Sequence, residues 1–532
     1  MKFYLNLASD SFAELLQSGR FVDNSLVIRE LARSMKAPDT KYVCISRPRR
    51  FGKTVTANML CTYYGMGHNA ATLFNSLQIA ADESYRTHLN QYNVIFIDMS
   101  NEFDDADQNV KKLKKNLTED IGEELQKLCP ELDLDSCRSL RKKLMAIYEQ
   151  IKQKFVFIID EWDCVMRQSR DDEAAIKDYL EFLKVLLKDK DHVALAYMTG
   201  ILPIKKYGDH SALNSFKEYS ILSPGRFAPY IGFTEGEVKA LCEANSVSFK
   251  EMRSWYDGYT VGEAVHIFNP NSVVNALTER RFSSFWTKTE SSSEALGIYL
   301  RLNFKGLRDA IVRLLAGGEE LIDTQSFEND LTSFKNRDHV LTLLVHLGYL
   351  TATPAESSYR KFWVRVPNRE VREELEAVIL DEKKYSKTAA ALRGADRLLE
   401  ALQQGDEQSV ARGVARAHEQ CCSMLTYNDE NSLACALTLA FYSARDHYTL
   451  IRELPSGKGF ADLVFIPHPG EDLPALLIEL KYDASADSAL TQIKDKHYPQ
   501  ALEAYRGNLT LAGISYDPKT KEHSCVIERG GN

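Results

Sequence analysis

The chain has 532 residues, of which 44% are hydrophobic and 27% charged, a composition typical of globular proteins and a length that suggests about three domains. Its apolar runs are strand-sized, and none approaches the roughly 20 residues that span a bilayer, so no membrane association is predicted. The formal net charge of −9 argues against a protein that coats nucleic acid by bulk electrostatics, while leaving room for a local basic groove.

The ten cysteines are scattered without the paired spacings of a metal site. Cys421 and Cys422 are adjacent and Cys435 lies one helix further on, which could form a site, but buried reduced thiols are the simpler interpretation. The N-terminal segment has neither an extended apolar core nor a small-residue cleavage site, so no signal peptide is predicted. We therefore expect a cytoplasmic protein.

The first half of the chain alternates strands with helices. Residues 1–40 read as a helical lead-in. Strand-sized apolar runs then occur at residues 42–45, 93–98, 155–160 and 192–199, and helix-compatible stretches separate them. Apolar strands of this kind, connected by helices, indicate an α/β fold with a parallel sheet that is covered on both faces.

A phosphate-binding loop is predicted at residues 47–54, RPRRFGKT, directly after the first strand and before a helix. Backbone N–H groups at a helix N-terminus point at bound phosphates, and the helix dipole favours negative charge there. Lys53 would reach the β- and γ-phosphates, and the Thr54 hydroxyl would hold Mg²⁺. The departure from the usual GxxxxGK[ST] pattern is Arg47, which replaces the first glycine.

The third strand ends in two carboxylates, Asp160 and Glu161. Because ligands of open parallel sheets bind at the carboxyl ends of the strands, Asp160 would bind Mg²⁺, through water, and Glu161 would polarise the attacking water. The fourth strand ends at Thr199, a polar residue placed to sense the γ-phosphate. The alternative is that the acidic pair only caps the following helix.

The sequence to this point resembles the AAA-ATPase-like proteins of bacterial genomes, which are related to archaeal-type and STAND ATPases. The resemblance covers roughly residues 5–290 and is carried by SRPRRFGKT, FIIDEWD, MTGILPI, YDGYTVGE, FNPNSVVNAL and the lead-in FAELLQSGRFVDNSLVIREL. In that family an arginine at the position of Arg47 is usual. The resemblance implies ATP and Mg²⁺ as cofactors, Asp160 and Glu161 as the Walker B pair, and a nucleotide site that includes Arg50, Phe51, Gly52, Lys53, Thr54 and Thr199. It leaves Arg49, Arg50 and Arg226 as candidates for phosphate or partner contacts, with surface salt bridges as the simpler role for any one of them.

Beyond residue 236 the strand signal fades, and residues 236–340 read as mainly helical. A helix around residues 340–344 precedes two short β-like pieces near 350–351 and 362–364, which suggests a winged-helix-like module. Residues 380–420, rich in Ala, Glu and Arg, read as linking helices.

Near the C-terminus a strand hairpin carries charged residues within apolar runs. Asp462 lies in FADLVFI, and Glu479 and Lys481 lie in ALLIELK. Glu479 and Lys481 are two apart, so they share one sheet face, where plain core would make their charges costly. A metal resolves this cost, because Asp462 and Glu479 offer hard oxygen ligands for Mg²⁺ and Lys481 can orient or activate water. The alternative is an edge hairpin whose charges face solvent.

This D-x(n)-E-x-K arrangement resembles the PD-(D/E)XK nuclease superfamily, and GKGFADLVFIP and ALLIELKY look like the nuclease domain often fused to these ATPases. The resemblance implies that a glutamate on the preceding helix and a glutamine on the following one complete the site, roles that Glu430 and Gln492 fit. Residues 421–532 carry 10 Lys+Arg and 15 Asp+Glu, a net charge of −5, which counts against tight, constitutive DNA binding by this part alone.

The sequence thus predicts a P-loop ATPase domain at residues 1–235, a helical region with a winged-helix-like module at 236–420, and a small α/β nuclease-like domain at 421–532. The hypothesis is an ATPase coupled to Mg²⁺-dependent cleavage of nucleic acid, with DNA expected, in a mobile-element, repair or defence setting. The alternative is an ATP-driven switch whose last domain binds a partner or nucleic acid without cutting. A homo-oligomer or a protein partner fits either hypothesis.

Overall fold

The computed structural model describes most of the chain as two compact units, one formed by Met1–Thr287 and Leu321–Arg372 and the other by Lys288–Glu320 and Glu373–Asn532. The described residues are 4–7, 10–188, 190–204, 213–262, 266–286, 297–300, 302, 304–327, 334–356, 358–381, 386–422, 436–456, 459–468, 471–495, 502, 505 and 507–530. No helix in this described part is long and apolar enough to cross a membrane. The domain boundaries predicted after residues 235 and 420 stay a prediction.

The first unit is built on a parallel five-stranded sheet with the order β2-β3-β4-β1-β5. Its strands are β1 (Tyr42–Ser46), β2 (Asn93–Asp98), β3 (Phe155–Asp160), β4 (Val193–Gly200) and β5 (Lys217–Tyr219). The first four are the strands expected from the sequence, and the predicted α/β fold is confirmed. β4 lies between β1 and β3, so the loops that follow these three strands open at one edge.

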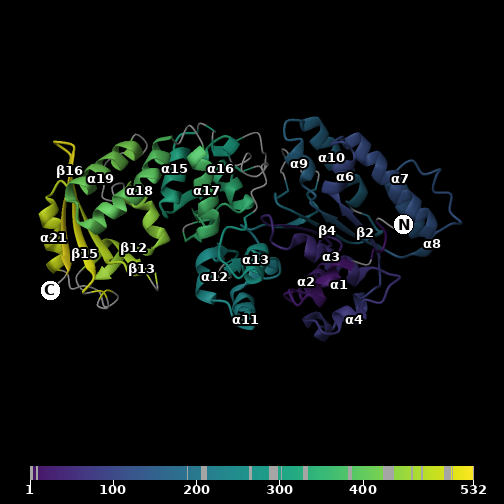
Figure 1. The fold of residues 1–532 in the computed structure, drawn as a ribbon. Coiled ribbons are helices and arrows are strands. Elements are labelled where there is room, and N and C mark those ends of the chain that lie inside the picture. Colours follow the sequence, from purple (N-terminus) through teal and green to yellow (C-terminus); the bar gives the residue numbers. More distant parts are fainter. Residues whose placement is uncertain are drawn as a thin grey trace. The chain divides into compact units, whose positions relative to one another are not determined.

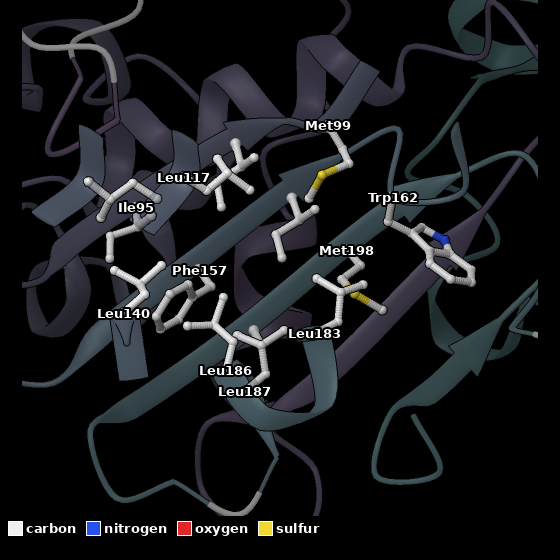
Figure 2. Packing of buried hydrophobic residues seen from close by; sticks show 14 of the residues in the cluster. Ile95, Met99, Leu117, Leu140, Phe157, Trp162, Leu183, Leu186, Leu187 and Met198 are labelled. Carbon is white, nitrogen blue, oxygen red and sulfur yellow. The ribbon is translucent and has the colours of Figure 1, made fainter. Parts of the chain in front are cut away.

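Helices cover both faces of this sheet (Figure 1), as continuous apolar strands require. Figure 2 shows one of the two layers, in which Phe157 and Met198 of the sheet pack against Leu117, Leu140 and Leu183. The elements around the sheet are α1 (Asp10–Gln17), α2 (Val27–Ser34), α3 (Lys53–Tyr64), α4 (Ala71–Phe74), η1 (Gln78–Ala81), α5 (Tyr85–His88), α6 (Met99–Asp105), α7 (Val110–Leu128), α8 (Leu140–Ile151), α9 (Cys164–Gln168), α10 (Glu173–Leu187) and η2 (Gly225–Phe227).

Residues beyond the sheet form a small helical cluster, and here the expectation of mainly helical structure was incomplete. The helices are α11 (Glu235–Asn245), α12 (Phe249–Tyr256) and α13 (Pro270–Glu279). The structure adds a three-stranded sheet with the order β6-β8-β7, from β6 (Phe233–Thr234), β7 (Tyr259–Thr260) and β8 (His266–Phe268). Strands of two or three residues are too short to produce an alternating pattern, which explains why the sequence did not indicate them.

The predicted helix and hairpin are both present in the first unit. α16 (Arg337–Leu347) ends at Gly348, whose φ of 90° lies in the left-handed region that glycine tolerates. The antiparallel hairpin of β10 (Thr351–Ala355) and β11 (Ser358–Arg365) follows, and β9 (Glu320–Asp323) completes a sheet with the order β10-β11-β9. The hydroxyl of Tyr259 donates to the Gly348 carbonyl at 2.7 Å and fixes the turn between helix and hairpin.

Acid should destabilise the first unit through His346. This side chain of α16 is buried and stacks on Phe327, and burial lowers its pKa to about 3. An unfolded histidine takes up a proton near pH 6.5. Between these two pH values the unfolded chain therefore binds more protons than the folded protein. The contribution of neutral His346 to stability is complete above the unfolded pKa and is lost as pH falls towards the folded pKa. We expect a loss of about 2 kcal/mol between pH 8 and pH 5.

Chemical denaturation at both pH values measures this effect. His346→Gln should show a smaller pH-dependent loss than the wild type, whatever its stability at pH 8. His447→Gln is the matched control, because the His447 side chain is 50% exposed. Equal losses in the wild type and in His346→Gln would exclude His346 as the cause.

The second unit contains a mixed five-stranded sheet, β12-β13-β14-β15-β16. Only β14 and β15 pair in parallel, and α21 (Ala486–Asp495) connects them. The strands are β12 (Tyr448–Ser456), β13 (Gly459–Pro467), β14 (Ala475–Tyr482), β15 (Leu509–Asp517) and β16 (Glu522–Gly530). The other elements are α15 (Leu307–Leu315), α17 (Arg369–Asp381), which begins in the first unit, α18 (Ser386–Gln404), α19 (Glu407–Cys422) and η4 (Tyr442–Asp446). The small α/β domain expected at the C-terminus is confirmed.

Candidate functional site

The predicted phosphate-binding loop joins β1 to α3. Gly52 is the N-cap of α3 with a φ of 82°, a left-handed conformation that a side chain would strain. Lys53 follows as the first residue of the helix, and its buried ammonium donates to the Pro48 carbonyl at 2.9 Å. Burial lowers the pKa of Lys53. The lysine is therefore folded back over the loop, while Thr54 is exposed beside it.

Arg47, the departure from the usual motif, is turned into the protein. Its side chain is fully buried, and Nη1 donates to the carbonyls of Ser46 and Tyr219, both at 2.9 Å. Nη2 donates to the Phe227 carbonyl at 3.4 Å. The guanidinium thus links the end of β1 to the end of β5 and to η2. Arg47 thus has a structural role at the base of the loop, and the residues from Arg49 to Thr54 line the cavity instead.

The acidic pair lies beside the loop, at the carboxyl end of β3. Asp160 is 1% exposed, and burial raises its pKa to about 6, while a hydrogen bond from Thr54 acts in the opposite direction. This hydrogen bond brings together the two residues predicted to hold Mg²⁺. Glu161 has a φ of 51°, and its carboxylate forms an ion pair with Arg167 of α9.

Two residues that the sequence analysis did not single out organise this acidic end. Asp163 is fully buried, and its Oδ2 accepts the backbone amides of Ile201 and Leu202 at 3.1 and 2.8 Å. The same oxygen lies 3.3 Å from Nε of Arg167. A Cβ at Gly200 would lie 2.5 Å from the Asp163 carboxylate, so glycine leaves the room this contact needs. The second aspartate of DEWD and an arginine four residues after it were the available signal.

Thr199, for which a role in sensing the γ-phosphate stays a prediction, lies inside the sheet. It is fully buried in β4, paired with Ile45 of β1, and its hydroxyl donates to the Ile45 carbonyl at 3.1 Å. It does not belong to the lining of the cavity described next. Arg226 is also outside that lining, and it contacts Ser34 and lies 3.6 Å from the buried carboxylate of Glu30.

A cavity of about 750 Å³ opens over the loop and the acidic end. Its lining contains Arg49 to Thr54 of the loop together with Glu161 and Arg167. Segments distant in sequence add apolar side chains: Leu15, Phe21 and Val22 of the lead-in, Phe233 of β6, and Val274 of α13. The lining thus combines charged and apolar side chains, at a size typical of small-molecule sites.

Two asparagines in the lining connect α13 and the lead-in to neighbouring segments of the first unit. Asn271 of α13 lines the cavity and accepts a hydrogen bond from Arg50 at 3.3 Å, which ties the helix to the loop. Asn24 of the lead-in lines it too and donates to the Tyr230 carbonyl at 2.8 Å. The residues present fit a nucleotide with Mg²⁺: the loop and Lys53 would face the phosphates, Thr54 would offer an oxygen, and the apolar side chains would accept a base. Asp160 is buried and outside the lining, and its link to the cavity is its hydrogen bond with Thr54.

The second unit holds Glu479 and Lys481 close together on β14. Glu479 is 2% exposed, and Lys481 Nζ lies 3.6 Å from its Oε1, so the predicted shared face is confirmed. Glu479 is paired in register with Gly513 of β15, and a Cβ on Gly513 would lie 2.3 Å from the Ala486 carbonyl. The helix α21, which carries the half-buried Gln492, therefore covers this face.

Two predicted members of this site have side chains outside the described residues. Asp462 lies on β13, one residue before Leu463, which pairs with Ile478, and Glu479 is the residue after Ile478. The backbone thus brings positions 462 and 479 to the same end of the β13–β14 pairing. Glu430 lies outside the described residues altogether. In the described part, no group of three or more His, Cys, Asp or Glu residues could hold a metal ion.

Two family models match the chain. Residues 7–208 match a model described as a predicted AAA-ATPase, and residues 428–524 match one described as the PD-(D/E)XK nuclease superfamily. Both resemblances seen in the sequence are thereby confirmed, in the expected order. The comparison with curated proteins gave no match.

Solved structures resemble the chain only distantly. The Aeropyrum pernix ORC2 protein in its ADPNP–ADP complexes is 14% identical, with 69% of this chain and 92% of that chain covered and a TM-score of 0.29. The Drosophila ORC bound to GC-rich DNA and Cdc6 is 10% identical, with 81% of this chain and 62% of that chain covered and a TM-score of 0.24. At such TM-scores neither likeness supports a statement about this chain.

Proposed function

We propose that this chain, in which a predicted AAA-ATPase segment precedes a PD-(D/E)XK nuclease superfamily segment, binds and hydrolyses ATP with Mg²⁺ and cleaves phosphodiester bonds of nucleic acid. DNA is the expected substrate, and a mobile-element, repair or defence setting is the expected context. The observation that carries the ATPase part of the proposal is the cavity, because its lining combines the loop, Glu161 and Arg167 with apolar side chains. The nuclease part is supported by the buried Glu479 and its 3.6 Å contact with Lys481.

In the first unit, each residue has a separate task. Bound Mg²⁺ supplies charge neutralisation at the phosphates, and Thr54 and Asp160 would hold it. Lys53 balances phosphate charge from the base of the loop. Glu161 faces the cavity and takes the proton of the attacking water. Asp163 and Arg167 hold the Glu161 carboxylate in place.

In the second unit, Glu479 and Asp462 would hold Mg²⁺, which supplies Lewis-acid activation of the phosphate. Lys481 orients the attacking water and balances charge on the phosphate, and its 3.6 Å contact with Glu479 fits that task. Gln492 and Glu430 are proposed to complete the site.

A second candidate function is an ATP-driven switch whose last domain binds without cutting. The observation in its favour is the net charge of −5 over residues 421–532, which contain 10 Lys+Arg and 15 Asp+Glu. Phosphate binding depends on local cations, so this charge counts against tight binding of a nucleic acid substrate by the last domain.

A cleavage assay separates the two. Purified protein is incubated with supercoiled plasmid, linear duplex and single-stranded DNA, in Mg²⁺ or Mn²⁺, with and without ATP. Cutting supports the first proposal, and its dependence on ATP measures the coupling between the sites. ATP hydrolysis without cutting of any substrate favours the switch.

Arg167 should act as a positioning residue for Glu161. Arg167→Ala removes the ion pair that holds the Glu161 carboxylate and leaves the phosphate-binding loop intact. We therefore expect the kcat of ATP hydrolysis to fall by about tenfold or more, while the KM for ATP changes less. Arg167→Lys should restore part of kcat.

Steady-state ATPase kinetics measure both constants. Arg170→Ala, three residues further along the same segment, is the control and should match the wild type. A larger change in KM than in kcat would mean that Arg167 serves nucleotide binding instead.

A further inference from the structure

We propose that the outer face of β11, formed by Lys361, Trp363 and Arg365, binds single-stranded nucleic acid. This inference rests on the proposed function, for which it supplies a surface that holds the substrate. It concerns residues that neither the nucleotide cavity nor the Glu479 site includes.

The arrangement begins with the alternation of β11. Phe362 and Val364 are buried and pack inward, at 8% and 0% exposed. The residues between them therefore face outward, and Trp363 is 41% exposed. Of the four exposed large hydrophobic side chains in the described part of the chain, Trp363 is the one aromatic. An indole placed in water in this way costs free energy that a ligand can recover.

Cations stand on either side of this ring. Lys361 and Arg365 lie two residues before and two residues after Trp363. The pairing of β10 with β11 is irregular beside Lys361, but exposure still alternates, since Phe362 and Val364 are buried while Lys361 and Trp363 are exposed and Arg365 is half-buried. All three therefore lie on the outer side of β11. No ion pair is formed by Lys361 or Arg365 with any described residue. Within the described part of the chain, Lys361 is exposed and Arg365 is half-buried, and both can turn towards an anionic partner.

The local charge differs from that of the whole chain. The hairpin segment 351–365 contains three basic residues, Arg360, Lys361 and Arg365, and one acidic residue, Glu356. The neighbouring strand β9 ends in a further acidic residue, Asp323. Its carboxylate accepts a hydrogen bond from the backbone amide of Gln325 at 2.8 Å. Against a total of −9 for the chain, the hairpin segment has three basic residues and one acidic residue, a net charge of +2, and contact with phosphates requires such local cations.

A single strand fits this face better than a duplex. β11 is the central strand of its sheet, so Trp363 stands on a platform with a strand on each side. Stacking on such a ring needs a base whose face is free, and the bases of a duplex cover one another's faces. Aromatic rings on a sheet with flanking cations are a general means of holding single strands.

Binding is tested with the full-length protein carrying Glu479→Gln, so that the probe is not cut. Fluorescence anisotropy is recorded with labelled oligothymidylate and oligouridylate of about 15 nucleotides and with a duplex of the same length. Trp363→Ala should weaken binding of the single strands by about tenfold or more, and Trp363→Phe should retain most of it. Comparing the two oligonucleotides tells whether DNA or RNA is preferred.

The cations have their own readout. Lys361→Ala and Arg365→Ala should each reduce the slope of log Kd against log salt by about 0.7, the value for one phosphate contact on a single strand. The controls are Met145→Ala, which removes a side chain 42% exposed on α8, and Lys239→Ala on α11. Neither should change binding.

Equal binding by Trp363→Ala and the wild type overturns the inference, as does an effect confined to the duplex. This result is distinct from failure of the proposed function. A protein that cuts no nucleic acid but binds single strands through Trp363 retains the inference without the nuclease. If the protein cuts DNA and Trp363→Ala binds single strands as well as the wild type does, the proposed function holds and only this inference fails.

Discussion

Lys53→Ala is expected to abolish ATP hydrolysis, with a loss of about 100-fold or more in kcat/KM. The ammonium of Lys53 lies at the base of the loop, 2.9 Å from the Pro48 carbonyl, in the lining of the cavity. Alanine leaves the phosphate charge without this cation in a place where burial has already excluded water, and charges interact most strongly there. The loop itself should persist, because Gly52 and Arg47 fix it independently.

The effect on stability separates loss of binding from loss of folding. Burial lowers the pKa of Lys53, so its charge is a cost to the ligand-free protein. The ligand-free Lys53→Ala variant should therefore melt at or above the temperature of the wild type. Adding ATP and Mg²⁺ should raise the Tm of the wild type but not that of the variant, since a ligand stabilises only the form it binds.

Matched variants complete the test. Lys111→Ala removes an exposed lysine of α7 and should leave hydrolysis unchanged. Glu161→Gln should keep the ATP-dependent rise in Tm and lose hydrolysis, because it removes the proton acceptor and not the phosphate contacts. If Lys53→Ala hydrolyses ATP at the rate of the wild type, the cavity is not the site of hydrolysis.

The sequence predicted those parts of the nucleotide site that neighbouring residues encode. Strands buried on both faces appear as unbroken apolar runs, so β1 to β4 were found, and the loop and the acidic pair sit at their ends. The apolar part of the cavity lining could not be predicted, because Phe21, Phe233 and Val274 meet only after the chain has folded. No local pattern marks such a meeting.

Two individual residues show the same limit. Arg47 reads as one more cation in a basic loop, yet three carbonyls from β1, β5 and η2 hold it inside the protein. Thr199 reads as a polar strand end, yet its hydroxyl is used by the neighbouring strand. Both placements depend on partners distant in sequence, which periodicity and motif spacing do not report. By contrast, the Glu479–Lys481 contact was predictable because strand alternation alone places both on one face.

Glu479→Ala is expected to abolish nucleic acid cleavage, with a loss of about 100-fold or more, and to leave ATP hydrolysis unchanged. Glu479 is 2% exposed beneath α21, and a carboxylate is kept in such a place when a cation shares its charge. Lys481 supplies part of that charge at 3.6 Å. Alanine removes an oxygen ligand that the metal-dependent reaction needs and leaves the cation of Lys481 behind.

Glu479→Gln is the sharper variant, because it keeps the volume and removes only the charge. Glu528→Gln is its control in the same unit, since Glu528 forms an exposed pair with Lys494 at 2.5 Å, and surface pairs contribute little. Cleavage of plasmid and single-stranded DNA, measured beside ATP hydrolysis, gives both activities from one preparation. Cutting that survives both Glu479 variants would assign the nuclease to another site. If the wild type hydrolyses ATP and cuts nothing, Glu479 and Lys481 would instead belong to a domain that binds without cutting and is controlled by the nucleotide.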